Sequence, residues 1–355
     1  MKALITGANG LIGSHLVRAL AHRGYEVRGL VRATSDLRNL ENAAIELVIG
    51  DILQPETLAD AMQDCDLVFH TAAVFAYWGY KKSELTEIAK TGTENVLNAA
   101  AKAGVPRVIL TSSSVTIGST DQPLALSEKD NRPYADDPPY VFAKIEQERL
   151  AFERAKQLDL ELLAVCPTIT VGAPDFGLTE STQMIVNYLK DPLKASWIGG
   201  CNIVAAKDVA EAHILVSEKG QSGERYIVGA ENLEWQEVHT LLSEICGLPG
   251  PYMTAHHTSA YLAAAWYEAW HLFTGGTPPS SRAQAKMVGR YYWYNDNKIK
   301  QLGYNPSTAK QALIAALSWL IASEFIPASL RASMELSAEL RQYRNTKPIM
   351  TSMDE

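Results

Sequence analysis

Tyrosine and lysine spaced four residues apart on a helix form a pair that can move a proton. A free tyrosine hydroxyl has a pKa of about 10, and a neighbouring ammonium group lowers it. Residues four apart lie on the same helix face, so the lysine can supply that charge. The spacing occurs at Tyr77 and Lys81, at Tyr140 and Lys144, and at Tyr294 and Lys298. Such a pair suits a reaction in which a nascent alkoxide must gain a proton.

Position in the chain distinguishes these pairs. Tyr140 and Lys144 open a long helical pattern (140–157) that follows the fifth strand-like run and a turn at Pro138-Pro139. The pair at 77 and 81 follows the fourth run, and the pair at 294 and 298 lies in the C-terminal region. We therefore predict that Tyr140 is the acid and that Lys144 lowers its pKa.

A glycine-rich loop near the N-terminus suits a phosphate ligand. Residues 6–13 read T-G-A-N-G-L-I-G and separate the first strand-like run from the first helical run. Glycines in this position permit a tight turn and a close approach of backbone to pyrophosphate, while the helix N-terminus offers free N–H groups. We predict that this loop binds a dinucleotide through Gly7, Asn9, Gly10, Leu11, Ile12 and Gly13.

The elements that must position these residues alternate along the first half of the chain. Short apolar runs typical of buried strands occur at 3–6, 27–31, 46–48, 67–70, 108–111 and 162–165. Stretches with helical periodicity lie between them, at 12–21, 57–62, 91–103 and 140–157. The alternation predicts an α/β fold, a Rossmann-type doubly wound parallel sheet that binds ligands beyond the carboxyl ends of its strands.

The pattern loosens after about residue 170, where Pro, Gly and aromatic residues become frequent. We predict a dinucleotide-binding domain over 1–170, rejoined by residues 203–230 through a helix at 204–216 and a strand at 225–228. A smaller, mostly C-terminal substrate-binding region would comprise 171–202 and 231–328. Residues 329–355 would form a last helix and a disordered tail.

Several motifs, in order, resemble those of the extended short-chain dehydrogenases/reductases, which share the NAD-dependent epimerase/dehydratase fold. Loop 6–13 is similar to the family's T-G-x-x-G-x-x-G, and further matches are Gly50-Asp51-Ile52, His70-Thr71-Ala72-Ala73 and Leu302-Gly303-Tyr304-Asn305-Pro306. Together they span about residues 2–320. Dihydroflavonol reductase-like, 3β-hydroxysteroid dehydrogenase-like and hopanoid-associated sugar epimerase-like members look most similar. The resemblance implies that Asp51 and Ile52 contact the adenine side and that Thr71, Ala72 and Ala73 line the cofactor.

The resemblance also completes the catalytic set. The family's serine follows two small hydroxyl residues at the end of the fifth strand, which selects Ser113 from Ser112–Ser114. Ser113 would then bind the substrate oxygen beside Tyr140, while Tyr140 and Lys144 also touch the cofactor. Pro167 and Thr168 fit the nicotinamide-side loop. Ala89 stands where the family often has Asn, a departure shared by dihydroflavonol reductase-like members, and Cys166 stands where many relatives have Arg or Asn. We predict no metal site.

Cofactor choice depends on the end of the second strand, where an enzyme that prefers NAD usually has an acid. This chain has Val31-Arg32 there, and an arginine can pair with a 2′-phosphate. We therefore predict NADP as the preferred cofactor, with NAD as the alternative.

Two aromatic segments bear on the substrate. Residues 74–80 (V-F-A-Y-W-G-Y) follow the cofactor-lining run and suit an apolar or ring-containing substrate, with packing between domains as the alternative. Residues 258–273 have a helical pattern with a broad aromatic face. We interpret it as core packing or a dimer face, with a substrate lid or membrane-surface contact as alternatives.

Bulk properties narrow the choice of partners. The formal net charge of −8 argues against nucleic acid or an anionic membrane as the main partner. The four cysteines form no C-x-x-C pair, and no apolar stretch reaches the roughly 20 residues of a membrane span. We expect a cytoplasmic homodimer that acts on a small molecule.

The sequence thus predicts an NAD(P)-dependent carbonyl reductase or secondary alcohol dehydrogenase with a Ser-Tyr-Lys site. One alternative is an NAD-dependent nucleotide-sugar epimerase or dehydratase. Another is a non-catalytic dinucleotide sensor, which would have no need of Ser113, Tyr140 and Lys144.

Overall fold

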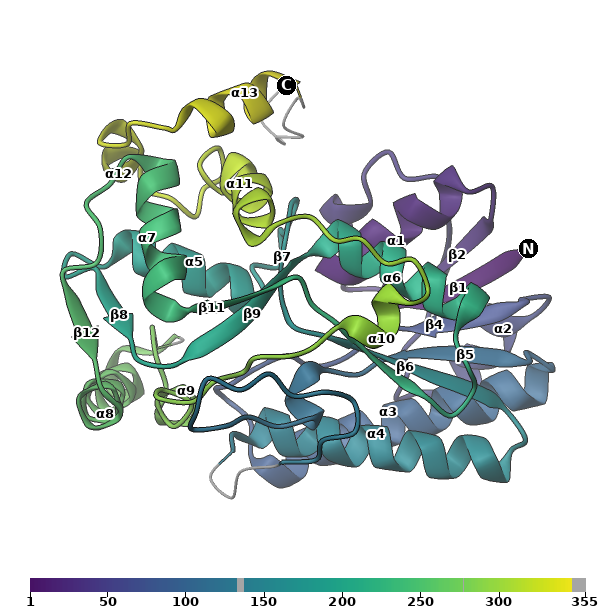
Figure 1. Cartoon of the computed structure of the whole chain (residues 1–355). Coiled ribbons are helices and arrows are strands. Elements are labelled where there is room, and N and C mark those ends of the chain that lie inside the picture. The colour runs from purple at the N-terminus through teal and green to yellow at the C-terminus, as the bar shows by residue number, and fades with distance from the viewer. Residues whose placement is uncertain (133–136, 277, 347–355) are drawn as a thin grey trace.

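The central sheet has seven parallel strands, with the spatial order β10-β6-β5-β4-β1-β2-β3. The structure is a computed structural model that describes residues 1–132, 137–276 and 278–346. The strands are β1 (Lys2–Thr6), β2 (Glu26–Val31), β3 (Glu46–Ile49), β4 (Leu67–His70), β5 (Arg107–Thr111), β6 (Glu161–Pro167) and β10 (Arg225–Val228). The order reverses between β1 and β4, and such a switch point is where open α/β sheets bind ligands. The predicted Rossmann-type sheet is therefore confirmed (Figure 1).

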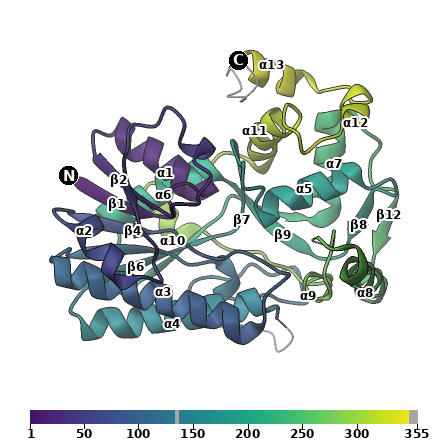
Figure 2. The ribbon, with the colours of Figure 1, turned by 180° about the vertical axis from the view of Figure 1, so that it is seen from behind.

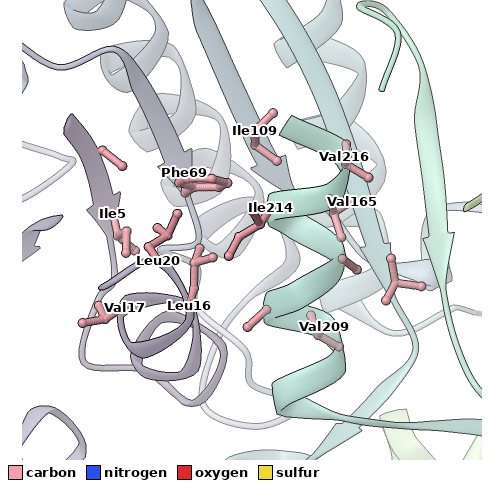
Figure 3. Close-up of a cluster of buried hydrophobic side chains, with 14 of the residues drawn as sticks. Ile5, Leu16, Val17, Leu20, Phe69, Ile109, Val165, Val209, Ile214 and Val216 are labelled. Atoms are coloured by element: carbon pink, nitrogen blue, oxygen red, sulfur yellow. The ribbon is translucent and has the colours of Figure 1, made fainter. Parts of the chain in front are cut away.

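Helices cover both faces of this sheet. On one face lie α1 (Leu11–His22) and α6 (Ala206–Lys219), and on the other α2 (Leu58–Met62), α3 (Lys82–Ala103) and α4 (Pro139–Gln157) (Figures 1 and 2). Leu16 and Leu20 of α1 and Ile214 of α6 pack against Phe69 and other strand residues in a fully buried cluster (Figure 3). Because both faces are covered, the strands carry continuous apolar runs, which is why they stand out in the sequence.

A second region lies beyond the carboxyl ends of the strands. It has a three-stranded sheet of β11 (Glu231–Glu234), β9 (Gly200–Ala205) and β7 (Ile169–Val171), and a pair of β12 (Met253–Ala255) and β8 (Ala195–Trp197). Its helices are α5 (Glu180–Lys190), α7 (Trp235–Cys246), α8 (His257–Thr274), α9 (Arg282–Ala285), α11 (Ala309–Leu320), α12 (Ala328–Ala332) and α13 (Ala338–Thr346). The short helix α10 (Asn297–Lys300) instead packs against the central sheet beside β10. Short 3-10 helices occur at Arg38–Leu40, Pro55–Thr57 and Ser114–Thr116. This region has its own apolar core.

Four expectations about elements were wrong in part. Residues 204–216 are not one helix, because β9 runs into α6 through a continuous apolar stretch that hides the boundary. Helix α3 begins at Lys82 rather than 91, since its first turns are mostly exposed and carry little apolar pattern. The C-terminal helix is two short helices, α12 and α13, and the expected disordered tail lies largely at 347–355, outside the described residues. Helix α8 forms at 257–274, but it is not a core helix, because only Ala264 and Glu268 are buried.

None of the helices in the described ranges is long and apolar enough to cross a membrane.

Candidate active site

Tyr140 and Lys144 lie one turn apart at the start of α4. Pro138 caps this helix and Pro139 takes its first position, where the absent N–H is not needed, so the helix begins immediately before Tyr140. Ser113 follows β5, and its hydroxyl is hydrogen-bonded to that of Tyr140. All three side chains are buried. The end of a buried strand and the start of a helix thus bring the three predicted residues together.

The neighbouring serines are engaged elsewhere. Ser112 Oγ donates to Glu148 Oε2 at 2.5 Å, and Ser114 is hydrogen-bonded to Tyr294. Ser113 is therefore the member of this run whose hydroxyl meets Tyr140.

The other two Tyr–Lys pairs do not form a helical pair. Tyr77 lies in the loop before α3, whose N-cap is Lys81. Tyr294 donates its hydroxyl proton to the carbonyl of Gly118 (2.9 Å), while the Lys298 ammonium lies 2.6 Å from a carboxylate oxygen of Glu224.

The ammonium group of Lys144 is held by a buried hydrogen-bond network that was not predicted from the sequence. Lys144 Nζ donates to the carbonyl of Thr111 (3.0 Å) and to Oε1 of Gln147 (2.9 Å). Gln147 Nε2 donates to Thr93 Oγ1 (2.7 Å), which lies 3.1 Å from Nε2 of His70. The other ring nitrogen of His70 lies 2.8 Å from Thr6 Oγ1, directly before the glycine loop. This hydrogen-bond network links Lys144 to the dinucleotide loop.

A small cavity beside this hydrogen-bond network is lined by Ala89, Tyr140, Lys144 and Gln147, among others. Ala89 occupies the position where the family often has Asn. Gln147, three residues after Lys144, supplies a side-chain amide to the lysine from the same helix. The sequence offered two signals that Gln147 binds Lys144: a polar residue on the buried face of the helix, and Ala89 at the position where the family often has Asn.

Burial governs the protonation of both catalytic candidates. It raises the pKa of Tyr140 to about 12, and the hydrogen bond from Ser113 opposes this rise. The expectation that Lys144 lowers the pKa of Tyr140 was therefore wrong, since desolvation of the phenolate outweighs other effects. Burial also lowers the pKa of Lys144 to about 8, against the opposing influence of Cys166 and Glu148. Tyr140 thus keeps its proton at neutral pH.

The glycine loop has the shape of a dinucleotide cradle. Gly7 has a φ of +71°, and a Cβ there would lie 2.8 Å from Cα of Ala72. A Cβ on Gly13 would lie 2.2 Å from the carbonyl oxygen of Gly7. Thr71 Oγ1 donates to the carbonyl of Thr6 (2.7 Å) and ties β4 to the loop. The N-terminus of α1, which starts at Leu11 and continues through Ile12, follows at Gly10 without a side-chain cap. Backbone donors therefore remain for phosphate.

The remaining cofactor candidates lie at the carboxyl ends of the strands. Asn9 is in the loop itself and donates to the carbonyl of Asp36 (3.2 Å). Asp51 follows β3 and accepts from the backbone N–H of Leu53, while Ile52 packs against Gly92 of α3. Ala73 lines the small cavity beside Tyr140, and Pro167 ends β6.

Thr168 follows Pro167 and is held by its surroundings. Its hydroxyl donates to Oδ1 of Asn202 at 2.8 Å. The remaining cofactor candidates thus lie around the carboxyl ends of the strands.

Arg32 lies at the end of β2 with an exposed side chain. Its backbone N–H donates to Ser35 Oγ, and its guanidinium makes no ion pair within the described residues. The nearby Arg38 differs, because it pairs with Asp36 at 2.6 Å and lies over the ring of Phe176. Of these two arginines, Arg32 is therefore the one whose guanidinium has no carboxylate partner in the described part of the chain.

An aromatic wall formed by Phe75 and Tyr77 covers Tyr140. The ring centroids of Phe75 and Tyr140 lie 4.8 Å apart, and those of Tyr77 and Tyr140 lie 5.6 Å apart. The backbone N–H of Tyr77 donates to Glu180 Oε1 at the start of α5 (3.3 Å), and Gln284 of α9 donates to the other oxygen of Glu180. The wall is thus fixed to the second region.

Comparison with known proteins places this geometry in context. The family model described as "NAD dependent epimerase/dehydratase family" matches residues 3–229. A protein of Synechocystis named "Putative dihydroflavonol 4-reductase" is 34% identical over 89% of this chain and 93% of its own length. Cinnamoyl-CoA reductase 1 of Oryza sativa is 34% identical over 68% of this chain and 75% of its own length.

Solved structures agree on the fold. The crystal structure of gox2253 superposes with a TM-score of 0.80 at 31% identity and covers 92% of this chain and 99% of its own. UDP-glucose 4-epimerase of Thermus thermophilus, solved with NAD, superposes with a TM-score of 0.70 at 21% identity, covering 89% and 98%.

Proposed function

The chain belongs to the NAD-dependent epimerase/dehydratase family and is an NAD(P)-dependent oxidoreductase acting on CH–OH or C=O groups, and we propose that it reduces an apolar or ring-containing carbonyl compound with NADPH. The observation that carries this proposal is the hydrogen-bonded Ser113 and Tyr140, with Lys144 one turn along the same helix, beneath an aromatic wall. A nucleotide-binding sensor would have no use for this set.

Each residue has one task in the proposed reaction. Ser113 binds the carbonyl oxygen and orients it, and Tyr140 donates its hydroxyl proton to that oxygen as negative charge develops. Lys144 keeps a positive charge near the phenolate that remains. The bound nicotinamide supplies the hydride, and the Gly7–Gly13 loop, Asp51, Ile52, Thr71–Ala73, Pro167 and Thr168 hold the dinucleotide.

The protonation of Tyr140 suits its proposed role as an acid. With a pKa of about 12, the hydroxyl is protonated across the neutral range and can donate its proton to a carbonyl oxygen.

The aromatic wall supports an apolar substrate. The rings of Phe75 and Tyr77 pack against the ring of Tyr140, and such an aromatic surface suits a flat or apolar carbonyl compound better than a sugar. The relatives named above are called reductases of a dihydroflavonol and of cinnamoyl-CoA, and both names denote ring-containing compounds.

Further parts of the proposal concern cofactor and organisation. The guanidinium of Arg32, which has no ion pair among the described residues, supports NADP over NAD. We propose that residues 1–170 with 203–230 hold the cofactor, and that 171–202 with 231–328 form the substrate side.

We also propose a cytoplasmic homodimer, whose subunit number sedimentation would measure. The four free cysteines fit that compartment.

One experiment separates the reductase from the epimerase. The purified chain is first denatured and its supernatant assayed for nucleotide, and a panel of aromatic and apolar ketones and aldehydes is then offered with NADPH. We expect little retained nucleotide and substrate-dependent loss of NADPH absorbance, because a net redox enzyme exchanges its cofactor each turnover. About one equivalent of tightly held NAD per chain, with no net redox change, would instead support an epimerase.

A further inference from the structure

Glu148 lies on α4 one turn after Lys144, and its side chain is buried. Its oxygen Oε2 accepts from the hydroxyl of Ser112 at 2.5 Å and lies 3.1 Å from Oγ1 of Thr116. The other oxygen, Oε1, pairs with a guanidinium nitrogen of Arg225 in β10 at 3.1 Å. A buried carboxylate is costly unless it is paired and hydrogen-bonded, and the partners of Glu148 come from three different parts of the fold.

Two of these partners flank Ser113. Ser112 precedes it directly, and Thr116 ends the 3-10 helix for which Ser113 is the N-cap. Thr116 Oγ1 also lies 2.9 Å from the backbone carbonyl oxygen of Ser113, so its single proton is shared between that carbonyl and Glu148. Glu148 is therefore tied to the backbone on both sides of Ser113, and it lies on the same helix as Tyr140.

Glu148 also acts on Lys144 through its charge, and it favours the ammonium form against the burial that lowers the pKa of Lys144 to about 8. Cys166 of β6 and His70 of β4 act on the same lysine, but both are uncharged where it titrates. Burial raises the pKa of the Cys166 thiol well above its ordinary value and lowers the pKa of His70 to about 3. Tyr140, with a pKa of about 12, is neutral as well. Of these groups, Glu148 is the one that supplies negative charge to Lys144.

Arg225, on the far side of Glu148, is anchored by other groups too. Its guanidinium donates to the backbone carbonyls of Glu128 (2.8 Å) and Asp130 (2.7 Å). Its side chain is 21% exposed, beside a cavity of about 780 Å³ whose charged lining also includes Glu128, Lys129, Glu224 and Lys298. Neutralising Glu148 would thus leave Arg225 held and partly solvated.

We propose, on the basis of the proposed function, that Glu148 is a positioning residue that holds Ser113 against Tyr140 and supports the charge of Lys144. An ion pair that only joins α4 to β10 would use Oε1 alone. The contacts at Oε2 instead reach the backbone around Ser113. The reaction is sensitive there, because a displacement of about 1 Å of a reacting group can cost about a hundredfold in rate.

Two substitutions separate the reach of Glu148 from its charge. Glu148→Gln keeps the length of the side chain and removes the charge, whereas Glu148→Asp keeps the charge and shortens the side chain by one methylene. The measurements are kcat and KM for carbonyl reduction against pH, and the Kd for NADPH. A further measurement needs no turnover: the pH titration of Lys144 by NMR of the chain isotopically labelled at lysine Cε, with the resonance assigned by its loss in Lys144→Met.

The two variants should differ in a defined way. In Glu148→Gln we expect the titration midpoint of Lys144 and the alkaline decline of kcat to fall together by at least about half a pH unit, because an opposite charge nearby favours the charged form. At neutral pH kcat should fall at least about tenfold, while KM and the Kd for NADPH stay within about threefold. Glu148→Asp should show the loss of kcat with the Lys144 midpoint unmoved.

Matched variants complete the test. Glu153→Gln makes the same substitution on α4 in an exposed pair with Arg149, and it should leave every measurement unchanged. Ser112→Ala removes one donor to Oε2 without leaving an unpaired charge, so it tests the same link even if Glu148→Gln does not fold. It should lower kcat at least about threefold with the Lys144 midpoint unmoved.

Other outcomes overturn the proposal. Near-normal kcat in Ser112→Ala and in the folded Glu148 variants, with lower stability alone, would make Glu148 a structural ion pair. An unmodified chain that reduces no compound of the carbonyl panel would reject the proposed function instead. In that case the NMR titration still decides: a lowered Lys144 midpoint in Glu148→Gln supports the role of Glu148 toward the lysine, and an unmoved midpoint refutes it.

Discussion

The ammonium nitrogen of Lys144 lies 2.9 Å from the side-chain oxygen of Gln147, three residues further along the same helix. Both side chains are buried, so this bond is formed away from water and is stronger than a surface contact. Gln147 in turn donates to Thr93 and so joins the lysine to His70. We infer that Gln147 is a positioning residue: it touches no reacting atom in the proposed mechanism but helps to keep Lys144 charged and in place.

The first prediction follows from this bond. The pKa of Lys144 is lowered from 10.5 to about 8, so its ammonium is present below about pH 8 and is lost above it. Turnover should therefore decline as the pH rises through about 8. Gln147→Met removes the acceptor and should move this decline downward by about one pH unit, because a hydrogen bond to a charged group contributes roughly 1.5–3 kcal/mol. Gln147→Glu supplies a carboxylate and should move it upward.

The pair of variants gives this prediction its control. The measurement is kcat for carbonyl reduction against pH for the unmodified chain and both variants. Opposite displacements of the alkaline limb would separate a role in holding the charge of Lys144 from simple packing. Equal losses of kcat in both variants with an unmoved limb would contradict the inference.

The second prediction concerns the proton donor. Tyr140→Phe should reduce kcat by at least about a hundredfold, the usual scale of a positioned acid, while the Kd for NADPH stays within about threefold. Tyr304→Phe is the matched control, because its hydroxyl is buried with no hydrogen-bond partner among the described residues and its ring belongs to the apolar cluster of α1 and α6. Steady-state kinetics and cofactor titration test both. A Tyr140→Phe variant of near-normal turnover would move the acid role to another residue.

Much of the fold and part of the site could be predicted from the sequence. Strands such as Leu67–His70 are buried throughout and apolar except for His70, since helices cover both faces of the sheet, and this makes them recognisable in the sequence. The order strand, turn, helix was enough to bring Tyr140 and Lys144 beside the end of β5, and the family resemblance then selected Ser113. That these three residues carry the reaction stays a prediction.

The parts that escaped prediction depend on environment rather than on residue type. The raised pKa of Tyr140 comes from burial, which periodicity cannot measure. The aromatic pattern of α8 predicts one apolar face, but that this face points outward could not be predicted, because it depends on the burial of Glu268 beside α9. Gln147 was missed because its partners Thr93 and His70 are distant in sequence.

The third prediction tests the dinucleotide loop. A Cβ at Gly13 would lie 2.2 Å from the carbonyl oxygen of Gly7, so Gly13→Ala should displace the loop. We expect a loss of about 1–3 kcal/mol in the free energy of unfolding, as for other overpacked sites, and at least about tenfold weaker NADPH binding. Gly177→Ala is the control, because a Cβ there would meet no described atom within 4 Å beyond its own chain neighbours. Thermal unfolding and cofactor titration of both variants measure the effect, and an unaltered Gly13→Ala variant would show that the loop can give way.

The fourth prediction concerns the choice between the two nicotinamide cofactors. Arg32 is exposed at the end of β2 without an ion pair in the described part of the chain, whereas Arg38 is held by Asp36. A 2′-phosphate would therefore meet an available guanidinium, and NADPH should bind more tightly than NADH. Arg32→Ala should remove most of this difference, about tenfold or more in Kd, because a charge-assisted phosphate contact contributes roughly 1.5–3 kcal/mol. Arg23→Ala is the control. It removes an equally charged side chain at the end of α1, where Arg23 pairs with Glu211, and it should leave the preference for NADPH intact. Equal affinity of the unmodified chain for NADPH and NADH would mean that Arg32 is only a solvated surface residue, and the assignment to NADP would then have to be given up.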